Sequence, residues 1–265
     1  MENDSPVGRI PGGASVSPST TGVECILRLD VLGSWHQTGE VTTMMKRTKL
    51  ADRSLPVYSV GEEIANTATH LLGGVLGVLA LILCVLRAAD RGGAPEITGA
   101  AIYGSCLVLL YAASSIYHGL PRGMAKKVLQ VLDHCAIYFL IAGSYSLVCL
   151  GVLRRTSPVL GWGILGMEWG LCAVATVLTA IDLKRYKVFS MFCYIGMGWA
   201  IIPLAALLFD IMTPGGFWLL LAGGVSYTLG AVFFSIPKKW LHSVFHVFVV
   251  LGSVLQFFAF YFYGI

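Results

Sequence analysis

Residues 64–86 read IANTATHLLGGVLGVLALILCVL, an almost unbroken apolar run that contains only a few polar side chains. An α-helix needs about 20 apolar residues to cross the roughly 30 Å of hydrocarbon in a bilayer. Runs of this length recur along the chain at residues 64–86, 97–117, 129–151, 159–181, 188–209, 215–236 and 241–263. Continuous runs lack the alternation of barrel strands, and a spanning helix satisfies its own backbone hydrogen bonds. The sequence therefore predicts an all-α integral membrane protein, a bundle of seven transmembrane helices.

The composition supports the same class of protein. Of the 265 residues, 56% are hydrophobic and only 12% are charged, against about 25% charged residues in a typical soluble domain. The mean hydropathy is +0.77. The formal charge of +4 comes from basic residues in short connectors between apolar runs, not from one basic face. We therefore expect membrane lipids as partners and no nucleic acid; the sequence identifies no protein partner.

The basic residues also predict the orientation, because cytoplasmic loops of membrane proteins are rich in Lys and Arg. Twelve basic residues fall on one side of the predicted spans: Lys46, Arg47, Lys49, Arg53, Arg122, Lys126, Lys127, Lys184, Arg185, Lys187, Lys238 and Lys239. Four fall on the other side: Arg87, Arg91, Arg154 and Arg155. This asymmetry predicts a cytoplasmic N-terminus and, with seven spans, a C-terminus outside.

Residues 1–55 differ from the rest of the chain. Their stretch GRIPGGASVSPSTTG, residues 8–22, is rich in Gly, Ser, Pro and Thr, a composition that cannot bury enough apolar surface to fold alone. We expect a disordered N-terminal extension over 1–55 and a transmembrane domain over 56–265. Met44 and Met45, followed by KRTK, offer an alternative translation start, which would make the extension a mis-assigned one.

Ionisable residues inside spans are costly and mark functional sites. With the predicted topology, His118 lies at the cytoplasmic end of the second span, and Asp133, His242 and His246 lie near the cytoplasmic starts of the third and seventh spans. Ser114 precedes His118 by four residues, so the two share a helix face, as do His242 and His246. These side chains are therefore expected at one depth in the bundle.

Three imidazoles at one depth suit Zn²⁺, which in catalytic sites commonly takes three protein ligands and leaves a fourth position open. The predicted zinc ligands are His118, His242 and His246. In HSVFH, Ser243 stands where a zinc protease of the HExxH type has Glu, so a proton acceptor has to come from another helix. Asp133 is the candidate catalytic base, and Ser114 is the candidate residue to orient a water or a substrate oxygen.

Each of these assignments has a structural alternative. The three histidines could make separate interhelical hydrogen bonds, Asp133 could only fix a histidine tautomer, and Ser114 could bond its own backbone four residues back.

Two further sets of polar residues lie within the spans. Glu63, Asn66 and His70 occur at i, i+3 and i+7 and so form one stripe on the first span; we expect them to form a structural polar cluster. Glu168 is isolated in the sequence and is expected to be protonated or hydrogen-bonded against a neighbouring helix.

Several segments match a known pattern, in order along residues 60–265: EIANTATHLLGG, SSIYHG, LDHCAIYFLIAGSYS, YIGMGW and HSVFHVFVVLGSVLQFF. They closely resemble the haemolysin III family, the bacterial branch of the progestin and adipoQ receptor superfamily. The resemblance implies seven helices, a cytoplasmic N-terminus and a zinc ion held by His118, His242 and His246. It also places the family's Ser and Asp near the metal at Ser114 and Asp133, and its first-helix motif at Glu63, Asn66 and His70. Gln256 departs from the family, since many relatives carry His there, but this position is not a ligand.

The resemblance, with a more distant similarity to alkaline ceramidases, suggests a zinc-dependent hydrolase of a lipid amide or ester. Such an enzyme would act in membrane lipid homeostasis, in a bacterial cytoplasmic membrane. The alternatives are a non-enzymatic membrane regulator or receptor stabilised by zinc, and the pore-forming cytolysin that the family name implies. The sequence offers little for the cytolysin, because it has no amphipathic insertion segment and its spans read as permanently integral.

Overall fold

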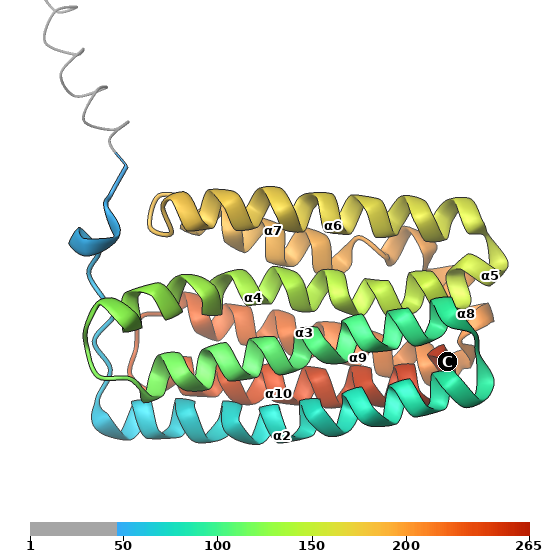
Figure 1. The fold of residues 1–265 in the computed structure, drawn as a ribbon, viewed down its shortest axis with the longest axis horizontal. Coiled ribbons are helices and arrows are strands. Elements are labelled where there is room, and N and C mark those ends of the chain that lie inside the picture. Colours follow the sequence, from blue (N-terminus) through green and yellow to red (C-terminus); the bar gives the residue numbers. More distant parts are fainter. Residues whose placement is uncertain (1–46) are drawn as a thin grey trace, which may run out of the picture. The chain divides into compact units, whose positions relative to one another are not determined.

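The computed structural model describes residues 47–265, and every regular element in that part of the chain is helical. Residues 1–46, most of the predicted extension, lie outside the described residues. Seven helical segments are long and apolar enough to cross a membrane, by length and composition. They lie side by side in Figure 1, and the predicted seven-span, all-α architecture is confirmed.

The first three spans consist of α2 (Val60–Arg91), α3 (Ala94–Gly119) and α4 (Met124–Val148), which continues through a π-helical turn (Cys149–Leu153) into α5 (Arg154–Thr156). The remaining spans are α6 (Pro158–Ile181), α7 (Lys187–Trp199) with α8 (Ala205–Ile211), α9 (Thr213–Ser235), and α10 (Leu241–Ala259) with a final π-helical turn (Phe260–Gly264). A short 3₁₀ turn, Leu50–Asp52, precedes them.

The fifth span is broken, where the sequence predicted one helix over 188–209. A 3₁₀ turn, Ile202–Leu204, separates α7 from α8. The cause is Pro203, which has no backbone N–H to donate and whose ring clashes with the preceding turn of an α-helix.

Helix α2 begins at Val60, four residues before the predicted apolar run. Ser59 accepts a hydrogen bond from the Glu62 backbone N–H, while the Glu62 carboxylate accepts one from the Ser59 N–H at 2.8 Å. This reciprocal capping box satisfies backbone donors that a helix start would otherwise leave free. It fixes the entry into the helix that carries Glu63, Asn66 and His70.

Helices that follow one another in the chain pack together, and α10 also packs on α2, so the spans form a closed bundle. Glycines allow the closest approaches. A Cβ on Gly104 of α3 would lie 2.5 Å from the Leu81 Cα of α2, a distance that real side chains do not adopt. Helix α4 is the most buried span.

The burial pattern of α2 separates its two faces. Its buried positions recur every three or four residues: Glu62, Asn66, His70, Gly73, Gly77, Ala80, Cys84 and Ala88. Leu71 and Leu72 on the opposite face are 61% and 58% exposed. An apolar outer face with polar groups turned inward is typical of a helix in a bilayer.

One end of the bundle, here called the basic end, is where α2, α4, α7 and α10 begin and α3, α6 and α9 end. The charge count predicts that this end faces the cytoplasm.

The short segment 47–59 contacts the basic end. The Arg53 guanidinium donates to the Ile181 carbonyl at 2.7 Å, and the Thr48 N–H donates to the Asp182 carboxylate at 2.9 Å. Burial would raise the pKa of Asp182, but backbone hydrogen bonds from Thr48 and Arg185 outweigh it and hold that pKa below its usual value. The predicted domain boundary at residue 55 therefore falls inside a segment that contacts the bundle.

Candidate metal centre

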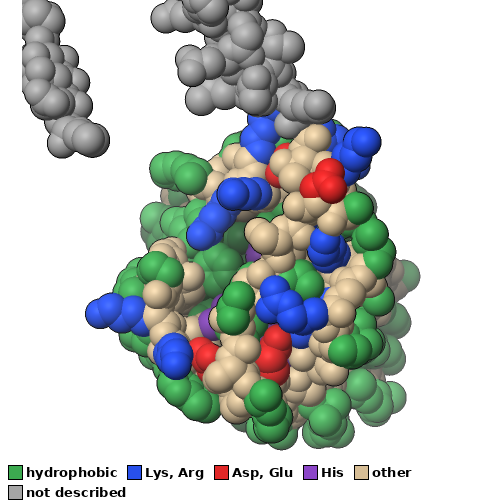
Figure 2. All heavy atoms as spheres, turned by 90° about the vertical axis from the view of Figure 1, so that its left-hand side faces the viewer, with side chains coloured by type: hydrophobic (Ala, Val, Ile, Leu, Met, Phe, Trp, Pro, Cys, Tyr) green, Lys and Arg blue, Asp and Glu red, His purple; other side chains and the backbone are tan. Residues whose placement is uncertain are grey.

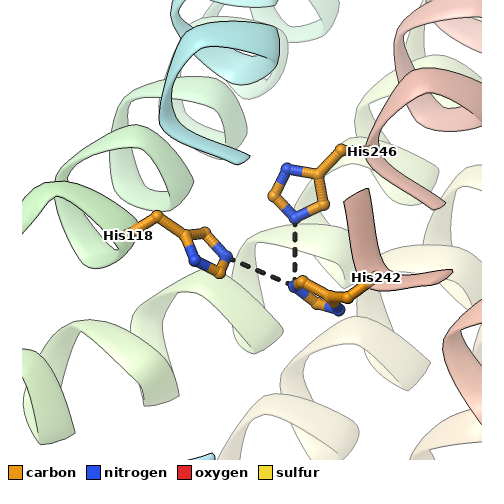
Figure 3. A group of neighbouring side chains, drawn as sticks. All are labelled: His118, His242 and His246. Carbon is orange, nitrogen blue, oxygen red and sulfur yellow. Dashed lines mark hydrogen bonds between the residues drawn. The ribbon is translucent and has the colours of Figure 1, made fainter. Parts of the chain in front are cut away.

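Three histidine rings meet inside the basic end of the bundle (Figure 3). His118 comes from the last turn of α3, and His242 and His246 come from the first turns of α10. The Nε2 atom of His242 lies 3.3 Å from Nε2 of His118 and 3.1 Å from Nε2 of His246. Among residues 47–265, these three form the group of side chains whose ligand atoms lie within 4.8 Å of one another and could hold a metal ion.

The other ring nitrogens fix the tautomers of His118 and His246. His118 Nδ1 lies 2.7 Å from the Glu63 carboxylate, and His246 Nδ1 lies 3.3 Å from the Asn66 backbone carbonyl. Both partners are acceptors, so each Nδ1 carries the proton and each Nε2 presents a lone pair. The Asn66 amide nitrogen also lies 3.3 Å from His118 Nδ1, but the carboxylate is closer.

Hydrogen bonding alone does not account for this cluster. His242 Nε2 carries at most one proton, so it can donate to one of the two neighbouring lone pairs and must repel the other. A cation bound among the three nitrogens would remove the conflict. Ligands about 2.0–2.1 Å from a tetrahedral zinc are separated by about 3.3 Å, and the two spacings here are 3.3 and 3.1 Å. The residues present therefore fit such an ion.

A buried ion pair supports His118 from behind. The Lys126 ammonium lies 2.7 Å from the second oxygen of Glu63 and donates to the backbone carbonyls of His118 and Leu120. Lys126 thus gives the Glu63 carboxyl a cationic partner and braces the end of α3 against the start of α4. Sequence reasoning missed Lys126, because nothing in the pair Lys126-Lys127 shows which lysine points inward.

Helix α2 holds α10 in register through two residues. Asn66 accepts a hydrogen bond from the Ser243 hydroxyl at 2.6 Å. Glu62 accepts one from the backbone N–H of Trp240 at 2.7 Å, and Trp240 adopts a left-handed conformation with φ of 67°, which is uncommon for a bulky residue. Glu62, which sequence reasoning also missed, therefore stabilises the strained turn two residues before His242.

Aromatic rings enclose the histidines on two sides. The His70 ring stacks on His246 with centroids 3.6 Å apart, and the Tyr58 ring stacks on His242 at 4.9 Å. Burial, followed by the nearby Asp133 and Glu63 carboxyls, raises the pKa of Tyr58, so its phenol stays neutral. The first-span residues Glu63, Asn66 and His70, expected to form a cluster of their own, each contact a histidine of the candidate metal-binding group.

A cavity of about 130 Å³ opens beside the histidines. His242 and His246 line it, together with both candidate catalytic residues, Asp133 and Ser114. The Ser114 hydroxyl is buried and lies near the Asp133 carboxyl, with no partner at full hydrogen-bonding distance among the described residues. Asp133 lies 3.7 Å from His134 Nδ1. An acid and a hydroxyl therefore face the same space as two of the three imidazoles.

The part of the chain that contains the three histidines is similar to known proteins. Residues 58–257 match the family model described as "Haemolysin-III related". "Hemolysin-3" of Bacillus cereus is 39% identical over 205 residues, 77% of this chain and 92% of that protein. "Hemolysin-3 homolog" of Bacillus subtilis (strain 168) is 36% identical over 208 residues, 78% and 96% of the two chains.

A human protein is also similar. "Monocyte to macrophage differentiation factor" of Homo sapiens is 30% identical over 210 residues, 75% of this chain and 82% of that one. No solved structure matches the chain.

Proposed function

The chain belongs to the haemolysin III family, and from that membership and the histidine geometry we propose that it is a zinc-dependent hydrolase of membrane lipids. It would cleave an amide or ester bond of a lipid and so contribute to lipid homeostasis in a bacterial cytoplasmic membrane. The observation that carries the proposal is the convergence of three imidazole nitrogens beside a cavity lined by Asp133 and Ser114.

The donor set favours zinc over other common metals. Ca²⁺ and Mg²⁺ prefer oxygen ligands, whereas neutral imidazole suits Zn²⁺ and its neighbours in the first transition row. His118, His242 and His246 would hold the ion, and Glu63 and the Asn66 carbonyl would orient two of the rings. Partners of this kind set ligand basicity and metal affinity.

Bound there, zinc would supply a Lewis acid for a carbonyl oxygen and for a water molecule. The residues of the chain have separate roles. Asp133 accepts a proton from the attacking water, and Ser114 orients that water or the substrate oxygen with its hydroxyl.

The remaining wall of the cavity suits a lipid. Apolar side chains from α3, α4 and α10 continue the lining away from the histidines: Leu110, Ile137, Leu140, Ile141 and Val249. Such a wall excludes water from an acyl chain and leaves the polar groups gathered at one end.

The test begins with the purified chain. Metal analysis is expected to find zinc in a 1:1 ratio in the wild type and little in His246→Ala. Hydrolysis of a ceramide and of a matching ester is then followed by mass spectrometry. Asp133→Asn is expected to keep its zinc and lose turnover by about 10²-fold or more. A zinc-loaded wild type that turns over no lipid amide or ester would contradict the hydrolase.

A second function is supported by the placement of the ligands. The histidines join α3 to α10, two helices far apart in the sequence, so a bound ion would also brace the bundle. A non-enzymatic regulator stabilised by zinc needs only this brace. In that case Asp133→Asn retains both its zinc and its function in cells, whereas His118→Ala lowers the melting temperature.

A further inference from the structure

A second, larger hollow lies at the basic end of the bundle. Its volume is about 710 Å³. Its wall comes from segment 48–58, from the connection between α6 and α7, and from the connection between α9 and α10. Figure 2 looks onto this end, where Lys and Arg side chains gather and a histidine is visible between them.

Four lysines at the mouth carry the charge of this hollow. Lys184 and Lys187 come from the start of α7 and the turn before it, and Lys238 and Lys239 come from the turn before α10. All four are exposed, and none forms a salt bridge with a described residue. Four cations therefore face one space without an ion pair to any described residue.

The acidic residues of the wall do not cancel them. Asp52 and Glu62 also line the hollow, and so does Arg53. The Glu62 carboxylate already accepts hydrogen bonds from the N–H and hydroxyl of Ser59 and from the Trp240 N–H. The five basic side chains of the wall outnumber the two acidic ones, which leaves a positive hollow.

Two helix starts add to the positive potential. Helices α7 and α10 both begin at this wall. Helix α7 begins at Lys187, which lines the hollow, and α10 begins at Leu241, one residue before His242, which also lines it. Neither start is capped by a side chain of the preceding residue. Uncapped N–H groups and the positive end of the helix dipole favour an anion.

The hollow adjoins the cavity beside the histidines. His134, Tyr194, Phe234 and His242 line both the hollow and the smaller cavity beside the metal centre. Apolar residues also line the hollow, among them Val57, Phe234 and Ile236. A ligand with a charged head and an apolar tail fits this division better than a small free anion does.

We propose that the hollow binds the phosphate group of an anionic phospholipid, with Lys184, Lys187, Lys238 and Lys239 as its contacts. Lysine ammonium groups bind phosphate as point charges, and basic pockets at the ends of membrane helices bind anionic headgroups. The site lies where the spans end, at the level expected for headgroups. The binding stands without the proposed hydrolysis, because none of the four lysines belongs to the metal centre.

The test uses the full chain in nanodiscs of phosphatidylcholine with a minor share of phosphatidylglycerol, with retained lipid counted by native mass spectrometry. Each double variant, Lys184→Gln with Lys187→Gln or Lys238→Gln with Lys239→Gln, is expected to retain about tenfold less phosphatidylglycerol. The matched control is Lys49→Gln with Arg185→Gln, because both residues are exposed at the same end and neither lines the hollow.

Three outcomes would overturn the proposal. The control variant could lose as much phosphatidylglycerol as the double variants, which would mean that the whole face attracts anionic lipid. The double variants could retain as much as the wild type. The wild type could retain no phosphatidylglycerol from the mixed discs and yet bind inorganic phosphate in discs of pure phosphatidylcholine, while the double variants bind none. That result would assign the hollow to a soluble anion.

A further variant separates this proposal from the hydrolase. Asp133→Asn is expected to retain phosphatidylglycerol like the wild type, whether or not the wild type cleaves any lipid. Loss of retention in Asp133→Asn would contradict a site built by the lysines alone.

Discussion

Two glutamates inside the bundle, Glu63 and Glu168, differ in their polar partners. One oxygen of Glu63 meets the Lys126 ammonium at 2.7 Å and the other meets the His118 ring at 2.7 Å. Glu168 on α6 is fully buried, and neither of its oxygens has a hydrogen-bond partner among the described residues. The same side chain thus has polar partners at the candidate metal centre and has none among the described residues in the middle of a span.

The difference shows what keeps a charge inside a membrane protein. An ion without a partner costs several kcal/mol in a medium of low dielectric constant, so Glu168 is best accommodated as a neutral acid. Glu63, by contrast, has the Lys126 ammonium at one oxygen and the His118 ring N–H at the other. Substitutions that remove charge should therefore matter greatly near Glu63 and little at Glu168.

Removing the cation beside Glu63 should have the largest effect on stability. Lys126→Met leaves the carboxylate without its ammonium partner and is expected to cost about 2–3 kcal/mol in free energy of unfolding; the figure is low for a buried pair because Glu63 is 24% exposed. Thermal unfolding in detergent measures it. The control is Lys127→Met, one residue on and only half-buried; equal losses in both variants would refute the buried pair.

Removing the charge of Glu63 itself should weaken the metal centre. Glu63→Gln leaves the size of the side chain unchanged but removes the anion that orients His118, so zinc affinity is expected to fall about 10- to 100-fold. Titration against a competing chelator measures this affinity in the folded variant. Glu168→Gln should bind zinc as the wild type does, and a matching loss there would break the contrast between the two glutamates.

Loss of a hydrogen bond between two uncharged side chains near the histidines should lower the free energy of unfolding by less than loss of Lys126 does. Ser243→Ala removes the donor to the Asn66 side chain and leaves a buried acceptor unsatisfied, at a cost of about 1–2 kcal/mol. The matched change is Ser235→Ala, because that exposed hydroxyl bonds only the Ala231 carbonyl of its own helix. The melting temperature should fall in Ser243→Ala and stay almost constant in Ser235→Ala.

The smallest effect is expected at Glu168. In Glu168→Gln an uncharged amide of nearly the same shape replaces a neutral acid, so the free energy of unfolding should change by less than about 1 kcal/mol. A drop as large as that of Lys126→Met would show that Glu168 is ionised and paired, which would remove the distinction between the two sites.

Much of the candidate site could be predicted from the order and spacing of residues in the sequence. The ends of the apolar runs set the depth of His118, His242 and His246, and helical periodicity puts His242 and His246 on one face. The structure brings the three together. Lys126 and Glu62 could not be predicted in the same way, since each stands beside a second residue of its own type and only packing decides which one points inward.

The sequence by itself determined the number of spans, their positions and the level at which the histidines lie, because hydropathy and the helical repeat are local properties of the chain. Only the tertiary structure decided that α2 packs against α10. That contact places Asn66 between His246 and Ser243 and Glu62 under the Trp240 turn. Such contacts join residues almost 180 positions apart, and they depend on which helix faces fit together at close range.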